Sequence, residues 1–220
     1  MGGGGFLTGD IRSPLDDLLL SLSPRPRPRV VFLATAAGDS ERAIDAFHIA
    51  FANRDCETEA VRVFGIPDHP AERVARADVV VVAGGNTANL LVLWRLHGID
   101  VALRKTWEGG AAVGGVSAGA NCWFEACVTD SFSVALDGLE DGTGLLTGSF
   151  CPHFDGEARR RPVYTRLVAE GFPAGIACDD GAAAVYHGTS LVEIVADRQG
   201  ARGYRVSRAG VEPIETRVLG

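Results

Sequence analysis

Three stretches of the chain share one pattern: a short apolar run, then a turn rich in small or polar residues, then a segment able to form a helix. The apolar runs cover residues 30–36, 78–83 and 111–114. A continuous apolar run bounded by turn residues is typical of a parallel strand buried on both faces. Strands that alternate with helices predict an α/β fold whose mostly parallel sheet carries helices on both faces.

The remaining segments extend this plan over a single domain, residues 1–220. Ser13 and Pro14 predict a helix start, because serine is a good N-cap and proline suits the first helical position. A helix is expected up to about Asn53, and residues 57–63 read as the next strand. From about Thr147 the apolar segments become shorter and predict strands and hairpins, the last ones antiparallel, at 147–152, 174–178, 182–186, 191–195 and 203–206, with a helix at 160–169.

Composition excludes several classes of protein. The formal net charge of -7 argues against nucleic acid and anionic membranes as partners. No apolar run is long enough to span a bilayer, and no signal peptide is visible. The five cysteines are scattered without a C-x-x-C pair, so we expect reduced thiols in a cytoplasmic protein, with no metal and no cofactor.

The third turn has the sequence Gly115-Val116-Ser117-Ala118-Gly119-Ala120, which contains G-x-S-x-G between an expected strand and an expected helix through residue 125. This is the arrangement of a nucleophile elbow, in which a strained turn exposes a serine at the carboxyl edge of a sheet. The same pattern also occurs as an ordinary glycine-rich turn. Ser117 is therefore a candidate nucleophile that needs a base.

Five histidines are available, and one stands out by its position. His153 ends the short expected strand at 147–152, so it falls at a strand end, where ligands bind in parallel sheets. Ser117 lies at such an end as well. The other four histidines lie in a helix, a loop, a helix end and a hairpin turn. We therefore expect His153 to take the serine proton.

A third residue should orient the imidazole, and the candidates are the carboxylates between the serine and the histidine. Asp130 follows the helix expected after the elbow and can return to the sheet edge, so it is the first choice. Glu125, expected on that helix, is the reserve. The pair Asp179-Asp180 is interpreted as the cap of a strand turn, with a ligand contact left open.

An oxyanion site needs N–H donors fixed in advance. The N–H of Ala118, directly after the serine, is one candidate, and Gly85 in the loop after the second buried strand is another. Asn86 in the same loop is a candidate for substrate binding, although it can also cap its helix. The glycine run at residues 2–5 is either a flexible end, a functional loop or the remainder of a turn after a strand.

Three of these motifs together resemble one known family. Gly84-Gly85-Asn86-Thr87, the elbow, and Cys151-Pro152-His153-Phe154 occur in this order and at similar spacing in the peptidase E (aspartyl dipeptidase) family of serine peptidases, to which cyanophycinases are related. The resemblance covers most of the chain, to about residue 186. It implies a flavodoxin-like three-layer sandwich of glutamine-amidotransferase type and a Ser-His-Asp/Glu triad without metal.

The resemblance also implies a substrate. Peptidase E removes an N-terminal aspartate, and Gly156-Glu157-Ala158-Arg159 is similar to the segment that carries its substrate-binding arginine. Arg159 is therefore a candidate ligand for a substrate carboxylate, although the neighbouring Arg160 and Arg161 make the register ambiguous. We expect a small peptide as substrate, and a homodimer is left open.

Other functions use the same residues. A cyanophycinase-like hydrolase or an esterase would need the same serine and histidine. A non-catalytic relative could have kept the fold as a binding module. Glutamine amidotransfer is disfavoured, because that chemistry needs a cysteine where Ser117 stands.

Overall fold

The computed structural model describes all residues, 1–220, and its first half contains the parallel sheet that the apolar runs predict. Four strands lie in the order β2-β1-β3-β4, and every neighbouring pair is parallel. Their bounds are Arg29–Leu33 for β1, Glu57–Val61 for β2, Val79–Val82 for β3 and Ala112–Gly115 for β4. β3 is four valines, all buried, as expected of a strand covered on both faces.

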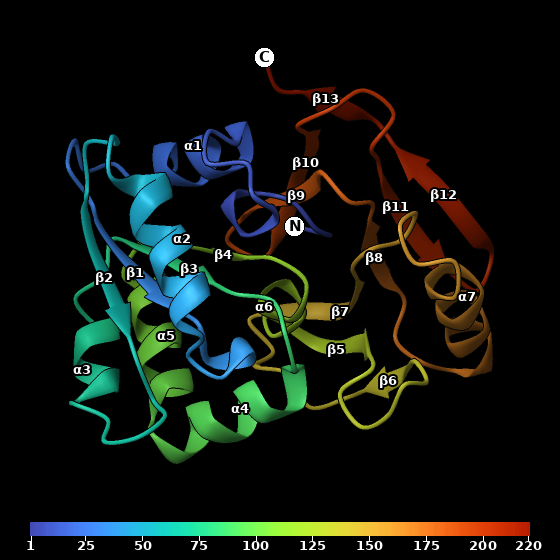
Figure 1. Ribbon diagram of the computed structural model, residues 1–220. Helices are drawn as coiled ribbons and strands as arrows, with labels where there is room; N and C mark the ends of the chain where they lie inside the picture. The colour runs from blue at the N-terminus through green and yellow to red at the C-terminus, as the bar shows by residue number, and fades with distance from the viewer.

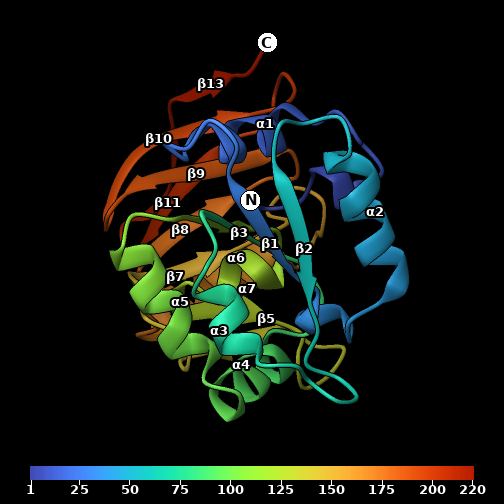
Figure 2. The ribbon, with the colours of Figure 1, turned by 90° about the vertical axis from the view of Figure 1, so that its left-hand side faces the viewer.

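Helices cover both faces of this sheet (Figures 1 and 2). On one face, an aromatic cluster that includes Phe32 and Phe47 joins β1 and β3 to α2 (Glu41–Phe51). On the other face, α4 (Thr87–Leu96) and α5 (Ile99–Glu108) bury Leu90, Trp94 and Leu103 in the largest core cluster. The short α3 (Pro70–Val74) contacts α5, and α1 (Pro14–Ser21) contacts β4. Alternate residues of one strand thus enter two separate cores.

The second half of the chain forms a six-stranded sheet and a three-stranded one. The larger has the order β12-β11-β8-β7-β5-β6, in which β5, β7 and β8 are parallel and the others are antiparallel. α7 (Arg160–Glu170) packs on it through Tyr164 and Val168. The strand bounds are β5 Phe124–Thr129, β6 Asp137–Leu139, β7 Leu146–Cys151, β8 Gly175–Cys178, β11 Gly203–Ser207 and β12 Gly210–Ile214.

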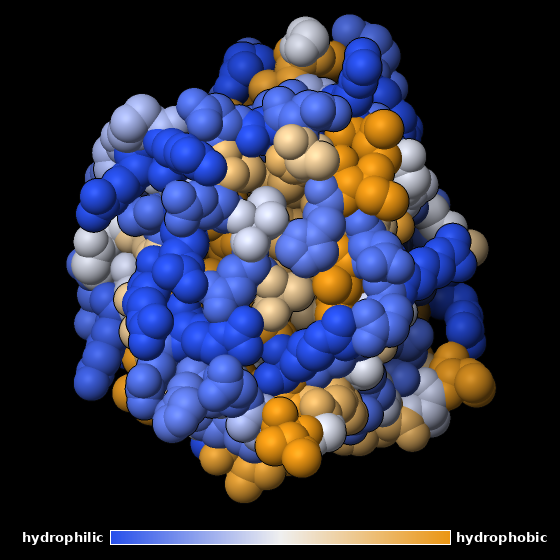
Figure 3. Space-filling model, turned by 60° about the vertical axis from the view of Figure 1, so that its left-hand side comes forward, coloured by the Kyte–Doolittle hydropathy of each residue, from blue (hydrophilic) through white to orange (hydrophobic).

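The three-stranded sheet has the order β13-β10-β9, with β9 Ala182–His187, β10 Ser190–Ala196 and β13 Thr216–Val218. The surface is mostly hydrophilic on the face that Figure 3 shows, with hydrophobic side chains in patches and on the floor of a hollow. No helix combines the length and apolar character that crossing a membrane requires.

Most strands and helices that the patterns predicted are present, and the helix at Ser13-Pro14 begins as expected. The Ser13 hydroxyl accepts a hydrogen bond from the Leu15 N–H at 3.3 Å. The expected helix after the elbow is wrong in its length. It ends at Asn121 after one turn (α6, Ala118–Asn121), and residues 124–129 form β5 instead. Glu125 therefore lies on a strand, where β-branched and aromatic neighbours outweigh the helical reading.

Candidate active site

Ser117 stands at a turn that only a glycine-rich sequence can form. Its backbone has φ 55° and ψ -116°, a conformation that residues with a side chain rarely adopt. A Cβ on Gly115 would lie 2.3 Å from the Gly119 carbonyl oxygen, and one on Gly119 would lie 2.3 Å from the Val82 carbonyl oxygen. Both glycines are thus required by the close approach of β4, α6 and β3, which holds the strained serine at the carboxyl end of the sheet.

His153 meets this serine directly. Nε2 of His153 lies 2.8 Å from Oγ of Ser117, within hydrogen-bond distance. His153 follows β7, and its φ of 53° is also in the left-handed region. The side chain is 22% exposed, so the imidazole can be reached from solvent. The structure therefore brings together the serine and the histidine that the sequence singled out.

The carboxylate beside the imidazole is Asp180, and the expectation of Asp130 at this place is wrong. Oδ1 of Asp180 lies 2.6 Å from Nδ1 of His153. Asp130 is exposed just beyond the end of β5 and makes no hydrogen bond to His153. The reserve, Glu125, instead accepts the Gly148 N–H at 2.8 Å.

Sheet topology explains why Asp180 is the partner. β7 and β8 are parallel neighbours with Cys151 opposite Ala177. His153 lies two residues beyond the end of β7 and Asp180 two residues beyond the end of β8, so both side chains emerge at one edge. The strand-end position that favoured His153 thus also applies to Asp180. Asp180 follows His153 in the chain, so it is not among the carboxylates between Ser117 and His153.

Asp180 is held on several sides. Its N–H donates to Oδ1 of Asp155 at 2.8 Å, and its carbonyl accepts from Arg198 at 2.6 Å. Cβ atoms added to Gly3 or Gly156 would lie 2.2 and 2.4 Å from its carboxylate oxygens. The glycine run at the start of the chain therefore lets the backbone pass directly beside the carboxylate, and Gly3 forms a parallel bridge with Asp180.

The neighbouring Asp179 has a structural role. Its Oδ2 accepts the Arg202 N–H at 3.0 Å and the Tyr204 hydroxyl at 3.2 Å. Burial raises the pKa of its carboxyl. The two adjacent aspartates thus separate into one that ties strands together and one that faces the histidine.

The expected oxyanion donors border the serine. A Cβ on Gly84 would lie 3.3 Å from Cβ of Ser117, so the Gly84-Gly85 loop passes against this serine. The N–H groups of Gly85 and Ala118 make no hydrogen bond inside the protein. Gly85 has φ 138°, and a Cβ there would lie 2.1 Å from the Ala36 carbonyl oxygen, so this position requires glycine. Two backbone donors are therefore free, one directly after the serine in the chain and one in the loop that passes against it.

Both the oxygen and the nitrogen of the Asn86 side-chain amide have hydrogen-bond partners within the protein. Its oxygen accepts the Asn89 N–H at 2.9 Å as the cap of α4, and its nitrogen donates to the Ser131 carbonyl at 2.9 Å. The side chain therefore fixes the loop after β5 against the donor loop. The structure favours this positioning contact over direct substrate binding.

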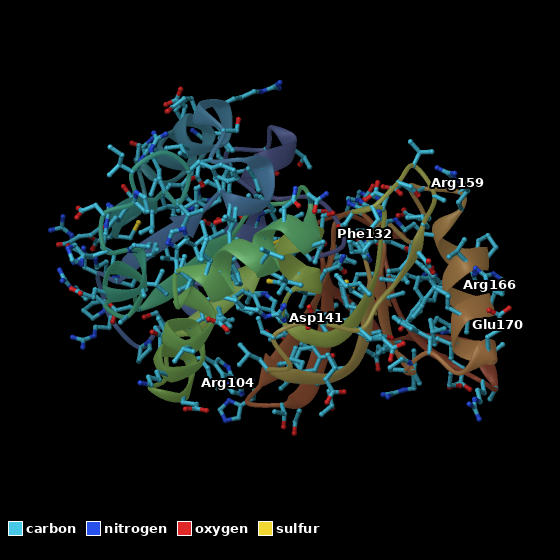
Figure 4. All side chains as sticks on the ribbon, turned by 90° about the horizontal axis from the view of Figure 1, so that it is seen from below. Arg104, Phe132, Asp141, Arg159, Arg166 and Glu170 are labelled. Atoms are coloured by element: carbon cyan, nitrogen blue, oxygen red, sulfur yellow. The ribbon has the colours of Figure 1, made fainter.

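The three consecutive arginines have three different environments. Arg160 is 3% exposed and donates to Glu157 and to the Val128 carbonyl. Arg161 lies over the rings of Phe154 and Tyr204. Arg159 is exposed at the start of α7, on the side where Phe132 lies (Figure 4), and its one hydrogen bond goes to the Val134 carbonyl at 3.0 Å. Arg159 and Arg161 thus both keep guanidinium N–H groups free of hydrogen bonds, but Arg161 is stacked on two aromatic rings.

No group of three or more histidine, cysteine, aspartate or glutamate side chains is placed to hold a metal ion. All five cysteines are free thiols, and four of them are buried. Burial raises the pKa of Cys127 and of Cys178 to about 12, so neither is a thiolate at neutral pH. The reactive geometry is that of Ser117 and His153.

Comparison with known proteins gives a family match over most of the chain. The model of peptidase family S51 matches residues 1–194. The chain belongs to this family. It is 45% identical over 226 residues to "Uncharacterized peptidase YgaJ" of Bacillus subtilis (strain 168), an alignment that covers 100% of this chain and 97% of the relative. We therefore describe the protein as a serine-type peptidase.

Two solved structures share the fold of this S51 peptidase. A peptidase from an acI-B1 Actinobacterium superposes with a TM-score of 0.75 at 19% identity, over 98% of this chain and 92% of that one. A Listeria monocytogenes EGD-e protein named as a candidate peptidase E superposes with a TM-score of 0.59 at 18% identity, over 80% and 90%. At these identities the comparison supports the α/β peptidase E-type fold predicted from the sequence.

Proposed function

We propose that the protein hydrolyses short peptides through a covalent acyl-enzyme, with Ser117 as nucleophile, His153 as general base and Asp180 as the residue that orients the imidazole. The observation that carries this proposal is the continuous hydrogen-bond line from Oγ through the imidazole to Asp180, at 2.8 and 2.6 Å. A serine becomes an effective nucleophile when a base within such a distance accepts its proton. Membership of family S51 supports peptide bonds as the substrate.

The steps follow from the positions of these atoms. Ser117 Oγ attacks the carbonyl carbon of the scissile bond, and its proton passes to Nε2 of His153. The carbonyl oxygen becomes an oxyanion beside the free N–H groups of Gly85 and Ala118. Collapse breaks the C–N bond, and the leaving amine takes the proton from Nε2. Water, deprotonated by the same nitrogen, then attacks the ester, the bond to Ser117 Oγ breaks, and Oγ takes the proton from Nε2 as the acid is released.

Asp180 acts through the imidazole. Its carboxylate accepts the Nδ1–H hydrogen bond, which leaves Nε2 as the acceptor for the serine proton, and it stabilises the imidazolium that forms during attack. The Asp155 and Arg198 contacts to its backbone keep this carboxylate in place.

Within this reaction, we propose that Arg159 recognises an acidic side chain at the N-terminal residue of the substrate. The free part of its guanidinium supports the proposal, because a planar fork suits a carboxylate. Its one partner, Val134, belongs to the loop that also carries Ser131, the partner of Asn86 beside the donor loop. One loop therefore connects Arg159 with the surroundings of the oxyanion donors.

A panel of dipeptides tests both levels of the proposal. We expect release of free amino acids from dipeptides, none after Ser117→Ala, and faster cleavage of Asp-X than of Ala-X or Asn-X. Arg159→Gln should raise the KM for Asp-X without changing that for Ala-X. Arg166→Gln is the matched control, because Arg166 lies on the same helix and is paired with Glu170 (Figure 4).

The outcomes separate the two levels. Equal cleavage of Asp-X and Ala-X, with no effect of Arg159→Gln, contradicts the aspartate specificity and leaves the peptidase mechanism standing. Cleavage of acyl esters without cleavage of any peptide favours the esterase alternative. Full activity after Ser117→Ala contradicts the mechanism itself.

A further inference from the structure

The same backbone contact follows Ser117 and His153, although they belong to different segments of the chain. The Asn121 N–H donates to the Ser117 carbonyl at 2.9 Å, and the Glu157 N–H donates to the His153 carbonyl at 3.1 Å. In both cases the donor lies four residues after the residue whose carbonyl accepts. Asn121 is the last residue of α6, and Glu157 closes the turn between His153 and α7. The positions of these two donors are thus tied to the backbones of the serine and the histidine.

Both of these backbones depend on such ties. The φ angle is 55° at Ser117 and 53° at His153, and residues with a side chain keep this conformation only where their surroundings fix it. The serine turn is fixed by the close packing of the elbow glycines. The turn after His153 is attached to β8 at one end, where the Phe154 N–H donates to the Cys178 carbonyl at 3.1 Å. Its other end is at Glu157, so a contact that holds Glu157 also acts on the histidine.

The side chain of Arg160 connects this turn to β5. Its Nε donates to Oε2 of Glu157 at 2.8 Å, and its Nη2 donates to Oε1 of the same carboxylate at 3.4 Å. Its Nη1 donates to the Val128 carbonyl at 2.9 Å. The Arg160 side chain is only 4% exposed, whereas that of Glu157 is 46% exposed. A buried guanidinium needs a partner for its charge and its N–H groups, and its fork can reach two partners at once.

The Val128 carbonyl also accepts a hydrogen bond from the serine side. Nδ2 of Asn121 lies 3.2 Å from this oxygen and 3.4 Å from the Thr87 hydroxyl, and Asn121 is buried. One carbonyl near the end of β5 therefore joins the element of the serine to the element of the histidine. Together with the Nε2–Oγ contact of 2.8 Å, these bonds form a closed ring. The members of this ring are Ser117, Asn121, Val128, Arg160, Glu157 and His153.

The contacts of Arg160 lead away from the helix that it begins. α7 spans Arg160–Glu170, and none of the side-chain hydrogen bonds of Arg160 goes to another residue of this helix. They go instead to the residue that closes the histidine turn and to β5. The same helix is attached to its sheet by other groups, among them the Tyr164 hydroxyl, which lies 2.6 Å from the Ser149 hydroxyl. The arginine is thus placed to fix the turn.

We propose that Arg160 is a positioning residue for the reaction, and that by holding Glu157 and the Val128 carbonyl together it fixes the distance between His153 Nε2 and Ser117 Oγ. This inference rests on the proposed function, because it requires His153 to accept the serine proton. Arg160 makes no hydrogen bond to either reacting side chain and acts only through the ring. A displacement of a reacting group by about 1 Å can cost about 100-fold in rate, so such support affects catalysis without taking part in the chemistry.

The test measures the rate constant and the final extent of Ser117 labelling by a fluorophosphonate, well below the Tm of each variant. We expect Arg160→Met to reach one label per chain at a rate about 10- to 100-fold lower than the wild type. Arg160→Lys should recover at least about threefold of this loss, because an ammonium group retains the ion pair with Glu157. Tyr164→Phe is the matched control. It removes a buried hydrogen-bonding group from the same helix outside the ring, and its rate should stay within about twofold of the wild type.

Two more variants test the ring from other points. Glu157→Gln removes the ion pair at a half-exposed position, so it can be measured even if Arg160→Met does not fold, and we expect labelling about three- to tenfold slower. Asn121→Ala opens the ring on the serine side and should slow labelling about fivefold or more. A ring that is already open loses little from a second break. The double variant Asn121→Ala/Arg160→Met should therefore be at most about threefold slower than the slower single variant.

Other results overturn the inference. Labelling at the wild-type rate in folded Arg160→Met, or in Glu157→Gln if the former does not fold, would show that the ring does not position the histidine. A slow rate in Tyr164→Phe, or no recovery in Arg160→Lys, would show that the rate follows the stability of α7 and not the contact with Glu157. Losses that multiply in the double variant would show that the two sides act independently. Absence of labelling in the wild type would contradict the proposed function, whereas a labelled wild type with unaffected variants contradicts this inference alone.

Discussion

Replacement of Asp180 by asparagine tests the proposed orienting carboxylate, which the sequence did not identify. Charges about 4 Å apart attract each other by about 1 kcal/mol in water and about 4 kcal/mol at the effective dielectric near a protein surface. The Asp180 side chain is 41% exposed, which screens the interaction and places the loss between these limits. Since 1.4 kcal/mol corresponds to a tenfold change, we predict that Asp180→Asn slows serine acylation about 100-fold.

The assay is the second-order rate of inactivation by a fluorophosphonate, which reports acylation of the serine without requiring the natural substrate. Asp130→Asn is the matched control, because Asp130 is an exposed aspartate at a strand end that does not contact His153. We predict less than a twofold change for this control. An unchanged rate in Asp180→Asn, or an equal loss in Asp130→Asn, refutes the assignment of Asp180 as the orienting carboxylate.

Three further predictions concern the surroundings. Gly156→Ala should slow inactivation by about twofold to tenfold, less than Asp180→Asn, because the added methyl group meets the Asp180 carboxylate at 2.4 Å. A wild-type rate would contradict this. Burial raises the pKa of Asp16 to about 7, so the folded state retains a proton that the unfolded state releases near pH 4. The free energy of unfolding should therefore fall by up to about 4 kcal/mol between pH 4 and pH 7, and Asp16→Asn should remove that slope in urea titrations. Thiol titration should detect at most the half-buried Cys56 in the native protein and all five cysteines in denaturant; two fast native thiols would show that a buried cysteine is open to solvent.

The sequence predicted the parallel sheet and the serine–histidine pair, because both depend on local patterns. Continuous apolar runs mark buried strands, and the φ of 55° at Ser117 requires the glycines that flank it. The position of His153 could be predicted because a strand end in a parallel sheet is a position that the local sequence reveals.

The carboxylate beside His153 could not be predicted in the same way, because its identity depends on which strands are neighbours. Asp130 and Asp180 both follow strands, and only the pairing of β7 with β8 places Asp180 beside the histidine. The length of α6 also depends on tertiary context, since Trp123 and Phe124 join the central core and the chain continues as a strand. The cavity between β4 and β9 also joins segments that lie far apart in the sequence.

Several expectations stay predictions. These are the homodimer, the cytoplasmic location and the assignment of the whole chain to one domain. The structure disfavours a role of Asn86 in substrate binding, because the oxygen and the nitrogen of its amide both have partners within the protein.

The most direct test of the account is to identify the residue that a fluorophosphonate labels. The proposal predicts one adduct per chain, located by peptide mass spectrometry on Ser117, absent in Ser117→Ala and at least about tenfold slower to form in His153→Ala. Peptide substrate should compete with the label in the wild-type protein. An adduct on another residue, or folded protein that remains unlabelled while it still cleaves peptides, would contradict the assignment of Ser117 as the nucleophile.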